Sequence, residues 1–215
     1  TAMNVPALPI PSTTLFGDHA TVACERAVAE LRAGRPVRLI AGDGHQLAVL
    51  ALDCATATSH DAFAALAGQR HLLLLSAERA AVLGRPVPHS LRLPLAGIDF
   101  AALPALAWLR PAATPAALPA SLPDTAPELD AAAIELTRLA LLLPALIALP
   151  LAAGDTTFDA SYGLAISTLA QAPAQADAHY QLVARTPVPL RDAGWSEFVV
   201  FRGGIAQRDQ VAIVV

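Results

Sequence analysis

Asp43 and His45 lie close together in the sequence, and their residue types could do chemistry. They flank Gly44 in the stretch AGDGHQ, and a carboxylate beside an imidazole can bind a metal ion or move a proton. Two ligands two positions apart do not close a metal site, whereas an aspartate in a Gly-rich turn commonly caps that turn. We therefore expect a solvated turn capped by Asp43.

A second group, Ser59, His60 and Asp61, contains the three residue types of a catalytic triad. Adjacent side chains cannot converge on one substrate atom, so a helix N-terminus with a favourably placed acid is the interpretation that we favour. Cys54 follows a strand-like run and is expected to be a small buried hydrophobic residue, not a nucleophile.

Two further groups contain arginine. Arg35 and Arg38, beside the turn, could bind a phosphate group, but a solvated face is the interpretation that we favour. Glu135 and Arg138 are three positions apart on a predicted helix, so we expect an intrahelical ion pair. The sequence thus predicts no catalytic, cofactor-binding or metal-binding residue.

The composition argues against several classes of protein. The net charge is −4 and the basic residues are scattered arginines, which disfavours nucleic-acid binding. The most apolar run, Leu139 to Ala153, is shorter than the ~20 residues that span a bilayer, so no membrane association is expected. The only two cysteines, Cys24 and Cys54, fit free thiols in a reducing cytoplasm.

The elements that position the turn come first in the chain. Asp18 or Thr21 can cap a helix that ends at Gly34. Alternating residues then predict a strand from Val37 to Ala41, and the apolar run from Gln46 to Leu52 predicts a buried strand. The turn of Asp43 lies between these two strands.

The next segment alternates between helices and strands. Thr58 or Ser59 is predicted to cap a helix that runs through Leu66, and Leu72 to Leu75 is a buried strand. Ser76 caps a further helix that Gly84 ends. This alternation predicts an α/β or α+β fold with a layered mixed sheet and helices.

Prolines dominate residues 94–127 and leave room for one short helix around Leu103 to Leu109. Asp130 to Leu143 is apolar on all sides except Glu135 and Arg138, which predicts a central buried helix. A linker and one more helix are expected in residues 154–170.

Residues 172–177 are interpreted as a hinge. Two strand-like runs then follow, Phe198 to Arg202 and Gln210 to Val215, joined across Gly203 and Gly204. They predict a partial β-hairpin.

Several stretches, in this order, resemble dihydroxybutanone phosphate synthase of riboflavin biosynthesis. They are AVAELRAGRPVRLI, the run from Gln46 to Val87 with SAERAAVLG, and DAAAIELTRLALLLPALI. The final stretch, VPLRDAGWSEFVVFRGGIAQRDQVAIVV, resembles the opening strands of GTP cyclohydrolase II. Thr1 and Ala2 before Met3 and the prolines that follow predict a tag remnant and an extended arm in residues 1–17. The resemblance implies a synthase-like domain in 18–172 and a linker with the start of a cyclohydrolase-like domain in 173–215.

The synthase family uses an acidic loop, a histidine motif and a divalent metal. Where that loop would end, this chain has Asp43 as its single acid. Glu128, Leu129 and Asp130 stand at the histidine, threonine and glutamate of the motif. The family's substrate loop has no counterpart, so the resemblance implies a synthase fold without synthase activity.

The cyclohydrolase family uses a zinc site of three cysteines and an arginine-rich cleft for GTP. Both would lie after Val215, so this chain is expected to have no cofactor and no GTP hydrolysis of its own. We expect a catalytically silent scaffold or dimerisation domain of a GTP cyclohydrolase II-like protein, with a homodimer as the candidate assembly. The alternative is a nucleotide- or flavin-binding regulatory module on the same fold.

Overall fold

The computed structural model describes residues 15–108, 119–123, 125–176, 180–191, 194–203 and 208–214. The expected N-terminal arm lies outside these residues, apart from its last three positions, as does the middle of the proline-rich segment. In the described part of the chain, no helix has the length and apolar character needed to cross a membrane.

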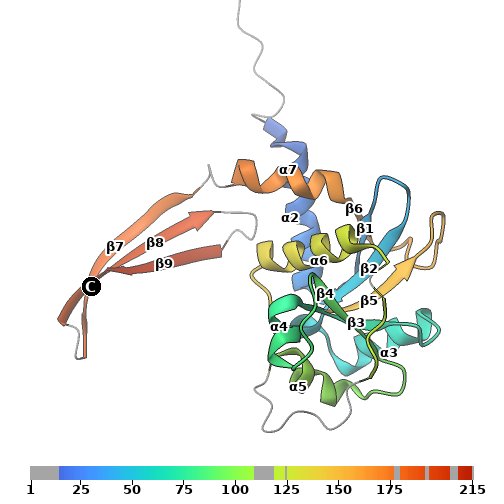
Figure 1. Cartoon of the computed structure of the whole chain (residues 1–215). Coiled ribbons are helices and arrows are strands. Elements are labelled where there is room, and N and C mark those ends of the chain that lie inside the picture. The colour runs from blue at the N-terminus through green and yellow to red at the C-terminus, as the bar shows by residue number, and fades with distance from the viewer. Residues whose placement is uncertain are drawn as a thin grey trace, which may run out of the picture.

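A mixed sheet of six strands forms the centre of the larger body (Figure 1). Its strands run in the order β4-β3-β5-β2-β1-β6, with β1 and β6 parallel and the other neighbours antiparallel. The strands are β1 (Val37–Ile40), β2 (Gln46–Ala51), β3 (Leu72–Ser76), β4 (Ser90–Pro94), β5 (Ala145–Leu151) and β6 (Tyr162–Ala165). The sheet confirms the predicted mixed α/β architecture.

Helices cover both faces of this sheet. Figure 1 shows α2 (His19–Arg32), α6 (Pro127–Leu139) and α7 (Ile166–Ala176) on one side. The other side carries α3 (Ala57–Leu66), α4 (Ala77–Val82), the short helix η2 (Phe100–Ala102) and α5 (Leu103–Ala107). A further short helix, η1 (Leu52–Cys54), follows β2.

The central strands are apolar throughout because both of their faces are buried. In β2, Leu47 and Val49 point into the core beneath α2 and α6, whereas Ala48 and Leu50 point into the core beneath α3 and α5. Successive side chains of a strand point to opposite faces, so one uninterrupted apolar run serves two cores.

Local signals place the ends of several helices as predicted. The carboxylate of Asp18 accepts a hydrogen bond from the backbone N–H of Thr21 and caps α2. Ser76 caps α4 through the N–H of Arg79. Gly34 follows α2 with a φ of +71°, a conformation that L-residues with a side chain rarely adopt.

Other predicted boundaries are wrong. The N-cap of α3 is Thr56, two or three residues before the predicted Thr58 or Ser59, because Thr56 and Ser59 form a reciprocal capping box. Helix α6 ends at Leu139, because Leu141 takes a φ of +55° and the N–H of Leu142 returns to the carbonyl of Thr137. That arrangement is a Schellman-type helix end, and Pro144 follows it.

The sequence analysis predicts no strand at β4, β5 or β6, and the structure has all three. The expected hinge at residues 172–177 is also wrong where it can be compared, because α7 continues through Ala176.

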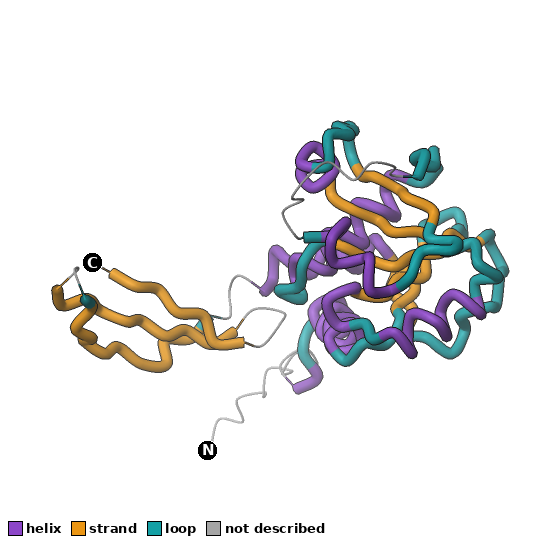
Figure 2. The backbone as a smooth tube through the Cα atoms, turned by 90° about the horizontal axis from the view of Figure 1, so that it is seen from below, coloured by secondary structure: helices purple, strands orange, loops and turns teal. Residues whose placement is uncertain are grey.

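A second, smaller sheet contains β7 (Gln181–Leu190), β8 (Gly194–Gly203) and β9 (Arg208–Val214), all antiparallel. Strands β8 and β9 are the predicted hairpin, and β7 extends it by a strand that was not predicted. The Arg202 and Asp209 side chains pair across β8 and β9 at 2.7 Å. Figures 1 and 2 show this sheet standing apart from the larger body.

Candidate functional site

A pocket of about 240 Å³ lies where the turn between β1 and β2 faces the N-terminus of α6. Asp43 and His45 line it from the turn, and Thr125 and Glu128 line it from the start of α6. The fold therefore brings together the two segments at which the synthase resemblance places its acidic loop and its histidine motif. This pocket is the candidate site.

The carboxylate of Asp43 contacts another residue of its own turn through both of its oxygens. One of its carboxylate oxygens accepts a hydrogen bond from the backbone N–H of His45, and the other lies 3.0 Å from Nδ1 of the His45 ring. The backbone hydrogen bond is the main reason why the pKa of Asp43 lies below its ordinary value. The predicted capping aspartate in a solvated turn is confirmed.

Asp130 does not line the pocket, but it is bound to Arg92, which does. Its two carboxylate oxygens receive Nε and Nη2 of Arg92 in a bidentate pair, each at 2.7 Å. Ser90 donates a further hydrogen bond at 2.6 Å. The side chains of Arg92 and Asp130 are 3% and 1% exposed, so this is a fully buried and well-satisfied ion pair.

Arg92 connects the pair to the segment before α6. Its Nη1 donates to the hydroxyl of Thr125 at 2.9 Å and to the carbonyl of Pro123 at 3.3 Å. Strand β4 thus holds the entry to α6 in place from the side of the sheet. The guanidinium thus donates to Asp130, Thr125 and Pro123, although Arg92 lines the pocket.

The side chains that line the pocket do not provide the set of oxygen ligands that a magnesium ion needs. Hard cations take several oxygen ligands, and the carboxylates lining the cavity are Asp43, which is tied to His45, and Glu128. Among the described residues, no group of three His, Cys, Asp or Glu side chains is arranged to hold a metal.

The two arginines near the turn have different surroundings. Arg35 is exposed and forms an ion pair with Glu30, as expected for a solvated face. The Arg38 side chain is only 14% exposed, so a solvated face is wrong for Arg38. Its Nη1 pairs with Asp159 at 2.5 Å and donates to Gln46 at 3.0 Å.

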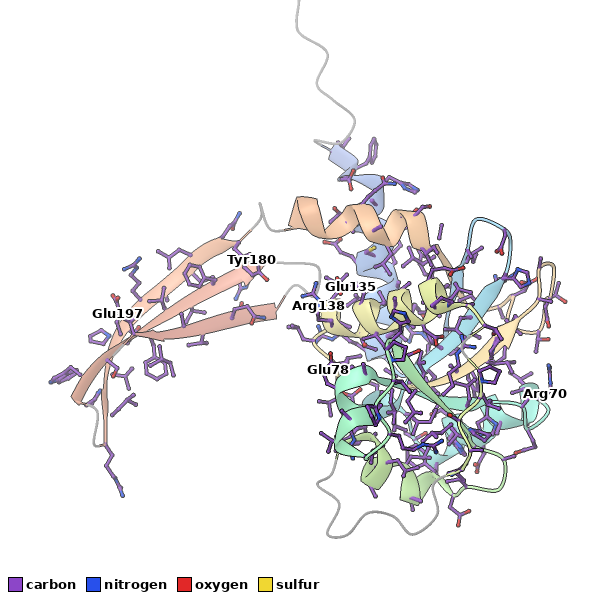
Figure 3. All side chains as sticks on the ribbon, in the orientation of Figure 1. Arg70, Glu78, Glu135, Arg138, Tyr180 and Glu197 are labelled. Atoms are coloured by element: carbon purple, nitrogen blue, oxygen red, sulfur yellow. The ribbon has the colours of Figure 1, made fainter. Side chains whose placement is uncertain are left out.

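Ser59, His60 and Asp61 do not form a catalytic triad. Ser59 belongs to the capping box with Thr56, Asp61 is exposed, and His60 is buried against His71. The expected intrahelical pair is confirmed: Figure 3 labels Glu135 and Arg138 together on α6, and their side chains meet at 2.6 Å.

The two cysteines are free thiols. Cys24 is fully buried in α2, and burial, with smaller contributions from Asp18 and Glu25, raises its pKa to about 11. Cys54 packs against the same core but is only half-buried, so the predicted full burial is wrong for this residue.

The sequence analysis missed Arg92 and His71. Arg92 lies in a strand that was not predicted, although the alternation of SLRLP is typical of a strand. Its partner is 38 residues away along the chain, a separation at which no local pattern signals a contact.

The chain is similar to two curated proteins, both called GTP cyclohydrolase-2. They come from Xylella fastidiosa strains Temecula1 and 9a5c and are 49% and 48% identical to it over 215 residues. The match covers 99% of this chain and 52% of each relative, so the chain spans about half the length of these relatives. No protein-family model matches the chain.

A solved structure has a similar fold. It is a two-domain 3,4-dihydroxy-2-butanone 4-phosphate synthase from A. baumannii, which is 17% identical, with a TM-score of 0.56. The match covers 89% of this chain and 69% of that structure. Along nearly all of its length the chain is therefore similar to part of the GTP cyclohydrolase-2 proteins, and its fold is that of a dihydroxybutanone phosphate synthase.

Proposed function

We propose that this chain is a catalytically silent, synthase-like scaffold domain of a GTP cyclohydrolase II-like protein in riboflavin biosynthesis. The buried Arg92–Asp130 pair is the observation that carries the proposal. Asp130 stands at the glutamate of the family's motif, and both of its oxygens are held by Arg92 and Ser90. A carboxylate held in this way is a poor general base or metal ligand.

The turn supports the same proposal. A synthase would need acids on both sides of a sugar phosphate, and the turn supplies Asp43, whose oxygens already bind His45. His45 and Glu128 are both exposed, so neither has the buried surroundings that shift catalytic groups.

The smaller sheet supports a role in a larger protein. Its exposed apolar side chains include Trp195, which is 73% exposed, and Leu182, Val211 and Ile213, which are each more than half exposed. Antiparallel sheets usually bury at least one face. We propose that β7 to β9 begin a cyclohydrolase-like domain whose remaining parts cover these residues.

Turnover of ribulose 5-phosphate tests the silent role. The chain would be incubated with ribulose 5-phosphate and Mg²⁺, and formate would be measured. Formate release above the background without protein would contradict the proposal, and no release beside an active synthase would support it.

The binding alternative has a test of its own. Both arginines that would favour a nucleotide are already paired, Arg35 with Glu30 and Arg38 with Asp159, which argues against it. A thermal-shift titration with GTP, FMN and riboflavin would decide, because a ligand that binds only the folded chain raises its Tm. We expect no shift at millimolar ligand.

A further inference from the structure

Two histidines outside the pocket lie in contact inside the core beneath α3 and η2. His60 in α3 and His71, directly before β3, are 5% and 2% exposed. Their ring centroids are 5.3 Å apart and their planes are inclined by 67°. Phe100 of η2 packs against His60 with a centroid distance of 5.6 Å. Three segments of the chain therefore meet at this pair.

The hydrogen bonding of the pair is incomplete. The carboxylate of Asp61 lies 3.1 Å from Nδ1 of His60, and because a carboxylate accepts, that nitrogen carries the proton and Nε2 has the lone pair. Nε2 of His60 and both ring nitrogens of His71 are buried without a hydrogen-bond partner among the described residues. Such groups cost stability even when the rings are neutral.

Protonation makes this arrangement worse. An imidazolium ring has two donors and a charge, and the buried nitrogens have no acceptor to receive them. Burial, and then the neighbouring His60, hold the pKa of His71 below its ordinary value. The charged residues on the surrounding segments are Asp61 in α3, Arg70 before β3 and Asp99 before η2. Asp61 contacts Nδ1 of His60, whereas Arg70 and Asp99 are exposed and water screens them from the buried rings.

We propose that His71, packed against His60, forms an acid-sensitive latch that holds α3 and the η2–α5 segment against β3 at neutral pH and releases them in acid. An opened segment exposes His71 with the ordinary pKa of a histidine, about 6.5. Below that pH the open form binds more protons than the closed form, so the closed form is fully favoured above it and loses stability as the pH falls.

Hydrogen exchange of the whole chain measures the latch. Peptides from residues 57–66 and 98–108 would be followed at pH 7.5, 6.5 and 5.5, with rates corrected for the intrinsic effect of pH. Between pH 6.5 and 5.5 we expect opening to increase by up to about tenfold, for the one proton that His71 takes up. Peptides from β2 and β5 serve as the reference, because local opening leaves them protected.

Variants separate the pair from other titrating groups. His71→Leu removes the inner ring, and His60→Phe keeps an aromatic ring against Phe100 without a titrating nitrogen. His71→Leu should abolish the pH dependence in the two peptides, and His60→Phe should weaken it, because His60 is the smaller cause of the lowered pKa of His71. The exposed His89→Gln should keep it. If His71→Leu does not fold, His60→Phe and the pH series of the unmodified chain still decide.

Trp108 gives an independent optical reading. It is half-buried and packs against this core, directly after α5, whereas Trp195 lies exposed in β8. In a Trp195→Phe background, acid should shift the emission of Trp108 to longer wavelength. The proposal would be overturned if the hydrogen-exchange rates of the two peptides, corrected for the intrinsic effect of pH, did not change with pH. It would also be overturned if both histidine variants kept the full pH response.

Discussion

Among single residues, the Arg92–Asp130 pair links the fold to the chemistry of the site. A buried ion pair recovers its desolvation cost only when the geometry is good and the remaining lone pairs are satisfied. Here two 2.7 Å contacts, the Ser90 hydroxyl and the Thr125 hydroxyl meet that condition. The same contacts that hold α6 on β4 occupy the carboxylate that a synthase would use.

Breaking this pair should be costly. Arg92→Met leaves the carboxylate of Asp130 buried and uncompensated, and we expect a loss of about 3–5 kcal/mol in the free energy of unfolding. Urea denaturation followed by circular dichroism measures it. The exposed pair gives the control, because Arg138→Met should cost less than about 1 kcal/mol. Equal losses in the two variants would contradict the structural role of Arg92.

Replacing both partners should be milder than removing one. In the Arg92→Met, Asp130→Leu variant no buried charge is left unpaired, so we expect it to recover part of the loss caused by Arg92→Met. The comparison uses the same denaturation measurement. A double variant that is less stable than Arg92→Met would contradict the expectation.

The two thiols should differ in reactivity. The pKa of Cys24 is raised from 9.0 to about 11, so at pH 8 its thiolate is about a hundredfold scarcer than that of an ordinary thiol, and its side chain is buried. Alkylation by iodoacetamide, followed by peptide mass spectrometry, should label Cys54 first. Both thiols should react in urea. Labelling of Cys24 as fast as Cys54 in the native chain would contradict the structure.

At the scale of elements, the corner after α2 shows how a glycine couples two parts of the fold. A Cβ on Gly34 would lie 2.6 Å from the backbone carbonyl of Cys54, and its φ is +71°. Gly84, after α4, has nearly the same φ of +72° but open space around it. The two positions share one backbone conformation and differ in their surroundings.

This difference predicts unequal losses from the same substitution. Gly84→Ala should cost about 1–2 kcal/mol for the left-handed conformation alone. Gly34→Ala adds a clash with a backbone carbonyl, typically worth about 1–3 kcal/mol more. Thermal and urea denaturation of both variants measure the gap. If the two variants lost the same free energy of unfolding within error, the backbone around Gly34 and Cys54 would be shown to relax and avoid the clash.

The elements that the sequence predicts well have strong local signals. Helices α2 and α4 have caps and a following glycine, and β2 and β3 are short apolar runs between turns. Strand β5 lacks such signals: it is apolar on both faces and contains Pro150, which cannot donate to the sheet ladder. A run of that kind is not distinguishable from a buried helix by periodicity.

The candidate site divides in the same way. The Asp43 turn can be predicted from the sequence because its glycines and its capping aspartate are neighbours in the chain. Arg92 and the contact between His60 and His71 depend on strands β3 and β4 meeting distant segments. Such contacts arise from the topology of the sheet, which the local pattern of the chain does not specify.

At the scale of the whole molecule, the two sheets should behave as separate units. Strands β7 to β9 contact one another, and Figure 2 shows them apart from the larger body. A chain that ends after Ala176 should therefore keep the Tm of the larger body within about 2 °C, less than a 1 kcal/mol change usually produces. A drop of more than about 5 °C would show that the smaller sheet supports the larger body.

Catalytic silence is the central claim, and turnover of ribulose 5-phosphate tests it most directly. The chain at high concentration would be given ribulose 5-phosphate and Mg²⁺, with formate detected by a coupled formate dehydrogenase. An active dihydroxybutanone phosphate synthase would run in parallel, and Asp130→Asn would serve as the matched variant. We predict formate at the no-protein background for the chain and for Asp130→Asn. Formate release by the chain above the background would contradict the account. Its loss in an Asp130→Asn variant that circular dichroism shows to be folded would then assign the activity to Asp130.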